Sequence, residues 1–141
     1  MTSLLKISEA ALLALHTACW LSQRGGLATT KEIASSLAVS EAHLSKVLQR
    51  LVKAGLVESV RGPKGGFRLG RRAEAMTLLE VYEVIDGRLA PTECLLGTLA
   101  CGGRCIMGDV IKQVNSLVVE RLTGTKVSEL GPSLREEPAD A

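Results

Sequence analysis

The chain has 141 residues, 46% of them apolar, and a formal net charge of +2. That apolar fraction is enough to form a core and excludes general disorder, and the length suits one domain with an appendage. Aromatic residues make up only 2% of the chain, so we expect aliphatic side chains packed between helices.

The N-terminal segment is apolar but holds Glu9 and has no basic leader. It therefore indicates a helix rather than a signal peptide. No apolar run reaches the roughly 18 residues that cross a bilayer. We expect a cytoplasmic protein with no membrane partner.

Three helices are predicted in the N-terminal half. Apolar residues at helical spacing predict the first over residues 8–23, with Gly25 and Gly26 ending it. A capping box at residues 29–32 opens the second, which runs to about Leu37. Ser40 caps the third, which continues to Ala54. Two short helices with a tight connection, the second one basic, are typical of a helix-turn-helix.

A β-hairpin is predicted after the third helix, followed by two further helices. Residues 56–60 alternate as a strand, the turn RGPKGG spans 61–66, and residues 67–69 form the returning strand. A second capping box at residues 77–80 begins a helix to Asp86. Apolar positions at helical spacing predict a long amphipathic helix from Ile106 to about Leu122.

These elements predict a mainly α fold with a small β-hairpin wing, that is, a winged helix-turn-helix with a long dimerisation helix. We expect a DNA-binding domain over residues 1–87 and a cysteine-bearing loop over 88–105. The dimerisation helix and C-terminal segment would occupy 106–130, and a disordered tail would follow over 131–141.

Basic residues gather in one part of this almost neutral chain. Between residues 42 and 72 there are eight Lys or Arg and one acid, Glu58. Such a block indicates a surface for phosphate, although a solvated face is the alternative. In a winged helix-turn-helix the second helix of the motif enters the major groove. The DNA-contacting residues that we predict are Ala42, His43, Ser45, Lys46 and Arg50 of this helix and Arg61 and Lys64 of the wing.

One such unit gives weak specificity, so we expect a homodimer that reads two half-sites. The long helix over residues 106–122 would be the interface. Its alternative role is that of an internal core helix. For His43, the alternative to a base contact is an ordinary exposed helix residue.

The segment TTKEIASSLAVSEAHLSKVLQRLVKAGLVESVRGPKGGFRLG followed by MTLLEVYEVIDG resembles the Rrf2 family of bacterial winged-helix regulators. The resemblance covers about residues 4–130, and its most specific parts are the RGPKGGF wing and the TLLEVYEVIDG helix. It implies a homodimer with a long crossed dimerisation helix, bound to palindromic double-stranded promoter DNA. It also implies base contacts from Ala42, His43 and Ser45 and a wing contact from Arg61.

Three of the four cysteines are close together, with the spacing C-x6-C-x3-C: Cys94, Cys101 and Cys105. In a cytoplasmic protein, grouped cysteines more often bind metal or sense redox state than form structural disulfides. The family resemblance implies that they hold an iron–sulfur cluster, 2Fe–2S or 4Fe–4S, with a fourth ligand from the first helix. The matching position is Glu9, although an acid in the first turn of a helix is also favourable without a metal.

The gap between the second and third cysteines is shorter than the family pattern. A zinc site and a metal-free thiol switch therefore stay open as alternatives. Cys19 lies on the apolar stripe of the first helix and is predicted to be a buried thiol.

We predict a transcriptional repressor that senses redox state, nitric oxide or iron–sulfur status. The alternatives are a regulator of the same fold that senses a metabolite and, in another class, an iron–sulfur electron carrier. We do not predict an enzyme or a small-molecule substrate, because the sequence holds no nucleophile–base motif and no phosphate-binding glycine loop after a strand.

Overall fold

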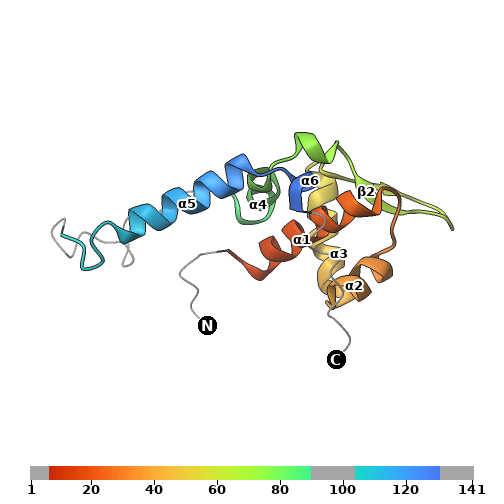
Figure 1. The fold of residues 1–141 in the computed structure, drawn as a ribbon. Helices are drawn as coiled ribbons and strands as arrows, with labels where there is room; N and C mark the ends of the chain where they lie inside the picture. Colours follow the sequence, from red (N-terminus) through yellow and green to blue (C-terminus); the bar gives the residue numbers. More distant parts are fainter. Residues whose placement is uncertain (1–6, 90–103, 131–141) are drawn as a thin grey trace, which may run out of the picture.

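The structure is a computed structural model that describes residues 7–89 and 104–130. Helices surround a small core, and one two-stranded hairpin projects from it (Figure 1). The elements in chain order are α1 (Glu9–Arg24), α2 (Thr30–Leu37), α3 (Glu41–Lys53), β1 (Val57–Val60), β2 (Gly66–Leu69), the 3₁₀ turn η1 (Ala73–Ala75), α4 (Leu78–Asp86), α5 (Val110–Gly124) and α6 (Val127–Leu130). The prediction of a mainly α fold with a hairpin wing is confirmed.

Helices α1 to α4 begin at side-chain caps. Thr29 and Thr77 each accept a hydrogen bond from the backbone N–H three residues on, and Glu32 and Glu80 accept one back from the cap N–H. Ser40 accepts from the N–H of His43 in the same way. Each cap satisfies backbone donors that have no partner within the helix. The predicted starts of α2, α3 and α4 are therefore confirmed.

The turn of the helix-turn-helix is made without glycine. Ala38 has φ 55° and ψ 45°, a left-handed conformation that is costly for a residue with a Cβ. Its N–H donates to carbonyls of the last turn of α2. This conformation allows only three residues, 38–40, to connect α2 to α3.

An isolated β-bridge, from Ala28 to Phe67, connects the hairpin to the body. β1 and β2 are antiparallel, with Val57 opposite Leu69 and Val60 opposite Gly66. Ala28, in the connection between α1 and α2, bridges Phe67 through two backbone hydrogen bonds of 2.8 and 3.0 Å. The base of the wing is thus fixed to the body, while its tip extends into solvent (Figure 1).

Aliphatic residues from α1 to α4 form the core, and the C-terminal segment adds to it. The N–H of Val127 donates to the carbonyl of Met76 (2.9 Å), and both side chains are fully buried. Thr125 accepts from the N–H of Leu78 at 3.0 Å. The segment after α5 is therefore hydrogen-bonded to the body at the start of α4.

The long helix begins later than predicted. Residues 106–109 are turns, Gly108 has φ 58°, and α5 starts at Val110 instead of Ile106. The left-handed glycine does not continue a helical turn, so the apolar spacing extends beyond the helix itself. The helix ends at Gly124, two residues after the predicted Leu122. Within the described residues, no helix has both the length and the hydropathy needed to span a bilayer.

Candidate nucleic-acid interface and thiol segment

The recognition helix α3 divides into a buried and an outward face. Four side chains are buried on the inner face: Leu44, Val47, Leu48 and Leu51. On the opposite face, exposed residues recur at steps of four, three and four: Ala42, Lys46, Gln49 and Lys53. Lys53 was not among the predicted contacts, although its seven-residue distance from Lys46 places it on the same face.

The other predicted contacts on α3 lie at the sides of this outward face. Ser45 is half-buried, whereas His43 is exposed. His43 and Arg50 are seven residues apart and so share one flank of the helix. This flank faces α1 and α4, because His43 lines a hollow with residues of α1 and Arg50 binds α4.

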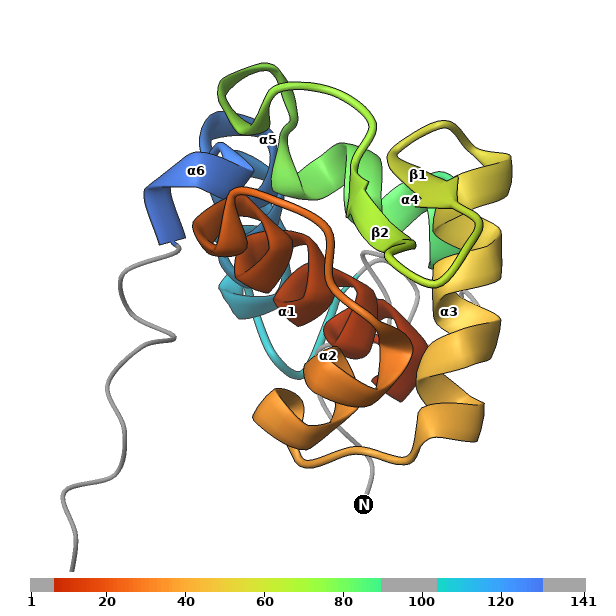
Figure 2. The ribbon, with the colours of Figure 1, turned by 90° about the vertical axis from the view of Figure 1, so that its right-hand side faces the viewer.

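The wing lies on the same side of the body as α3 (Figure 2). Its tip holds Arg61 and Lys64, which are exposed. The tip is tightly folded, because a Cβ at Gly65 would lie 2.1 Å from the carbonyl oxygen of Val60. A short, tightly folded basic turn therefore ends the hairpin, on the same side of the body as α3.

Ion pairing separates the basic residues into two groups. Each of four arginines in the described chain pairs with a carboxylate, at 2.8–3.6 Å: Arg24 with Glu32, Arg68 with Glu58, Arg71 with Glu80, and Arg72 with Glu74. Within residues 42–72, four basic residues form neither an ion pair nor a side-chain hydrogen bond with any described residue: Lys46, Lys53, Arg61 and Lys64. The unpaired cations are those of the recognition helix and the wing tip.

Arg50 belongs to neither group. Its Nη2 donates to the carbonyl oxygens of Ile85 (2.7 Å) and Val84 (3.3 Å) at the C-terminal end of α4. The side chain on which the sequence predicts a DNA contact is therefore directed at a neighbouring helix.

A hollow of about 370 Å³ lies between α1 and the start of α3. Apolar side chains of Leu12, Leu37 and others form its floor, and Glu9, His16 and His43 also line it. His16 is held by a 2.7 Å hydrogen bond between its Nδ1 and the carbonyl of Leu12. The structure thus brings the predicted ligand Glu9 near the recognition helix.

The predicted cluster ligands are only partly described. Cys94 and Cys101 lie outside the described residues. Cys105 is half-buried, and its Sγ accepts a hydrogen bond from the N–H of Met107 at 3.4 Å. Glu9 is exposed in the first turn of α1. Among residues 7–89 and 104–130, no three metal-binding side chains converge on one point.

Cys105 and Glu9 are not brought together within one chain. Figure 1 shows the segment before α5 at the outer end of that helix, whereas Glu9 begins α1 beside the body. Cys19 is confirmed as a buried thiol, since it is 3% exposed. Burial raises the pKa of Cys19 to about 11, because the thiolate would lose its hydration.

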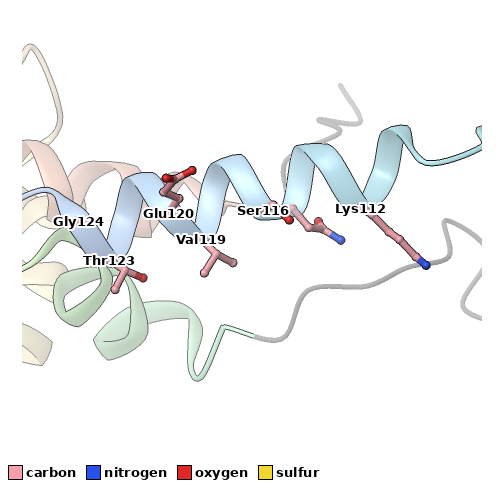
Figure 3. Close-up of a pocket in the computed structure, with 7 residues that line it drawn as sticks. Lys112, Ser116, Val119, Glu120, Thr123 and Gly124 are labelled. Atoms are coloured by element: carbon pink, nitrogen blue, oxygen red, sulfur yellow. The ribbon is translucent and has the colours of Figure 1, made fainter.

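Helix α5 has two accessible sides of different character and one buried side. Val110 and Leu117, two turns apart, are 48% and 65% exposed. The opposite side lines a hollow with Lys112, Ser116, Val119, Glu120 and Thr123 (Figure 3). Ile111 and Leu122, on a third side, are buried. The described residues therefore leave part of the apolar surface of α5 uncovered.

Comparison with known proteins places these features in a family. Residues 7–132 match the Rrf2 family model, which is described as an iron-dependent transcriptional regulator. The protein aau3 of Rhizobium meliloti is 37% identical over 107 residues, which cover 74% of this chain and 70% of aau3. The HTH-type transcriptional regulator IscR of Vibrio campbellii is 32% identical over 100 residues. The match covers 70% of this chain but only 60% of IscR.

Solved structures show the same fold. CymR, described as the global cysteine regulator of B. subtilis, superposes with a TM-score of 0.77 at 28% identity. That match covers 92% of this chain and 98% of CymR. IscR of T. potens superposes with a TM-score of 0.69 at 24% identity, over 97% of this chain and 94% of that one.

Proposed function

This chain belongs to the Rrf2 family of transcriptional regulators, and from that premise we propose that it is a homodimeric repressor that binds palindromic promoter DNA. The observation that carries this proposal is the set of unpaired cations on α3 and the wing tip. Cations that no carboxylate neutralises are available for phosphate contacts, and such contacts position the recognition helix for base contacts. As a DNA-binding protein it would act in the cytoplasm.

In this proposal Ala42, His43 and Ser45 contact base edges, and Lys46, Arg61 and Lys64 contact phosphates. Lys53, on the same face as Lys46, joins the phosphate contacts. The wing tip can also place Arg61 in a narrow minor groove, where the negative potential is strongest. Arg50, for which the sequence predicts a DNA contact, instead donates to the end of α4.

The test measures how binding depends on salt. The wild-type protein and its variants are titrated by fluorescence anisotropy into a duplex from its own promoter region, between 50 and 200 mM KCl. Lys46→Ala removes two phosphate contacts per dimer, so the slope of log K against log salt should become shallower by about 1.8. Arg61→Ala should do the same if its contact is to phosphate.

The matched control is Arg72→Ala, which removes the same charge from an exposed residue that is paired with Glu74. Its slope should equal that of the wild type. If the wild type shows no preference for promoter DNA over a scrambled duplex in either redox state, the proposed function is wrong. Equal slopes for Lys46→Ala and Arg72→Ala would refute the assignment of the interface.

The proposed dimer interface is the exposed apolar row of α5. The helix α5 extends away from the body (Figure 1), and the described residues leave its Val110 and Leu117 exposed. A second copy crossing there would bury both rows and hold two recognition helices at a fixed separation. Dimerisation would therefore be a requirement for reading two half-sites.

We propose that the signal acts through Cys94, Cys101 and Cys105, with Glu9 as the fourth ligand of an iron–sulfur cluster. The donor chemistry fits, because thiolates suit such a cluster and Cys105 is accessible and accepts an amide hydrogen bond. Since Glu9 lies away from Cys105 in one chain, it would ligate from the other subunit. A bound cluster would supply a centre that reacts with oxygen and nitric oxide.

Anaerobic purification with iron and sulfide assays tests the cluster. Wild-type protein should be coloured and contain both elements, and Cys105→Ala should lose them. Cys19→Ala removes a thiol from the core instead and should keep them. A colourless wild type that still binds the promoter, after expression with adequate iron, would contradict the cluster.

A cysteine-responsive, metal-free regulator is the second candidate. The similarity to CymR at 28% identity over 92% of this chain favours it. In that case the same thiols would act as a redox switch. A promoter affinity that changes with thiol oxidation, in protein free of iron and zinc, would support this candidate over the cluster.

A further inference from the structure

Arg50 is the one member of the predicted DNA-contact set that is directed at another helix. It lies on the flank of α3 that faces α4, and its Nη2 reaches two carbonyl oxygens of the last turn of that helix, at 2.7 and 3.3 Å. No carboxylate in the described chain pairs with it.

The electrostatics of a helix end explain this contact. The last carbonyls of a helix have no N–H partner within the helix, and together they carry a partial negative charge. Val84 and Ile85 lie in the last turn of α4, which ends at Asp86. The guanidinium of Arg50 therefore supplies both the missing donor and the complementary charge.

The other side of the same turn is also fixed. The carboxylate of Asp86 accepts hydrogen bonds from the N–H (3.0 Å) and the Oγ (2.5 Å) of Ser8, the N-cap of α1. The end of α4 is therefore anchored to α1. A side chain of α3 that binds there is therefore attached to a turn that is itself hydrogen-bonded to α1.

We propose that Arg50 is a positioning residue for DNA recognition, which sets the orientation of α3 by capping α4 and does not contact DNA. This inference rests on the proposed DNA-binding function. The core residues Leu44, Leu48 and Leu51 hold α3 against the body, but apolar contacts alone are non-directional. The Arg50 hydrogen bonds add direction, so they fix how the outward face meets the groove.

Base contacts depend on that orientation far more than phosphate attraction does. Loss of one well-placed base contact costs about tenfold or more in discrimination. Without its anchor α3 should therefore lose affinity for the promoter sequence by at least about tenfold, while its affinity for unrelated DNA stays the same. A residue that contacts phosphate would behave differently, because its loss weakens binding to all sequences.

The test compares Arg50→Met with Lys46→Met. Both variants keep an unbranched side chain and lose one positive charge from the same helix, but Lys46 faces outward. Affinities for promoter and scrambled duplexes are measured by anisotropy over the same salt range. Far-UV circular dichroism and urea unfolding establish that each variant is folded at the assay temperature.

For Arg50→Met we expect a specificity ratio reduced at least about tenfold, with the salt slope of the wild type. For Lys46→Met we expect both affinities to fall together and the slope to become shallower by about 1.8. If Arg50→Met instead shows the Lys46→Met pattern, Arg50 contacts phosphate and the inference is wrong. A variant that is less stable but keeps the wild-type ratio would also overturn it.

Arg50→Gln covers the case in which the methionine variant does not fold. The glutamine amide keeps hydrogen-bond donors but has no charge. The slope of log K against log salt alone then distinguishes a positioning residue from a phosphate contact. A positioning residue predicts the wild-type slope, whereas a phosphate contact predicts a loss of about 1.8. Wild-type protein without sequence preference would refute the proposed function instead, which distinguishes the two failures.

Discussion

The bridge between the wing and the body leads us to predict different stabilities for alanine variants at two glycines of the wing, Gly66 and Gly62. A Cβ at Gly66 would lie 2.6 Å from the carbonyl oxygen of Ala28, which accepts the 2.8 Å hydrogen bond from the N–H of Phe67. At Gly62 a Cβ would meet nothing within 4 Å. Both glycines have positive φ, +155° and +111°. Alanine at either position therefore strains the backbone, but only at Gly66 does it also collide with another part of the chain.

The difference between the two variants can be worked out. The backbone cost is of order 1–3 kcal/mol for each substitution. At Gly66 the chain must also move away from Ala28, which breaks two hydrogen bonds worth about 1 kcal/mol each. Gly66→Ala should therefore lower the free energy of unfolding by about 2 kcal/mol more than Gly62→Ala.

Urea unfolding followed by far-UV circular dichroism measures this difference. The protomer concentration is kept equal for all variants, because dimerisation contributes to apparent stability. Equal losses for the two variants, within about 0.5 kcal/mol, would show that the bridge between Ala28 and Phe67 does not hold the wing. A larger loss for Gly62→Ala would refute the steric argument altogether.

Three further predictions concern other parts of the chain. Ala38→Gly should raise the free energy of unfolding by about 0.5–1 kcal/mol, because glycine relieves the left-handed strain in the helix-turn-helix turn; an unchanged urea midpoint would contradict this. Leu117→Asp should convert the dimer to monomer in sedimentation velocity at micromolar concentration, and a surviving dimer would exclude the exposed row of α5 as the interface. The raised pKa of Cys19 means that the folded chain keeps a proton that the unfolded chain loses, so stability should fall as pH rises from 9 towards 11. Cys19→Ala should make that fall smaller and leave the part due to Tyr82, whose pKa burial also raises.

Local signals in the sequence were sufficient to predict where α2, α3 and α4 begin. Thr29, Ser40 and Thr77 could be recognised as caps, since a cap needs only residues within one turn of itself. The glycine-rich turn at 61–66 predicted the hairpin for the same reason. The bridge from Ala28 to Phe67 could not be predicted, because it joins backbone groups that are distant in the sequence and carry no side-chain signal.

The start of α5 shows where apolar spacing misleads. Ile106 and Met107 continue the helical period, but Gly108 turns the chain before Val110. The spacing reports which residues are apolar, whereas the helix start depends on backbone conformation. Likewise α6 was not predicted, since four residues have too little periodicity. Val127 is buried by parts of the chain that are distant in the sequence, and its N–H donates to the carbonyl of Met76.

The sequence also could not show which cations of residues 42–72 are available for phosphate, and the salt dependence of DNA binding measures how many are. The eight cations of residues 42–72 suggested one phosphate-binding surface, but three are ion-paired and Arg50 caps α4. Lys31, at the start of α2, has no ion pair among the described residues either. Within residues 31–72, the five cations per chain that are neither ion-paired nor bound to α4 give a dimer a salt slope no steeper than about −9, whereas all nine would give about −16. A wild-type slope clearly steeper than about −9 would mean that DNA binding breaks the arginine–carboxylate pairs. The contacts within the free protein would then not decide which charges reach the phosphates.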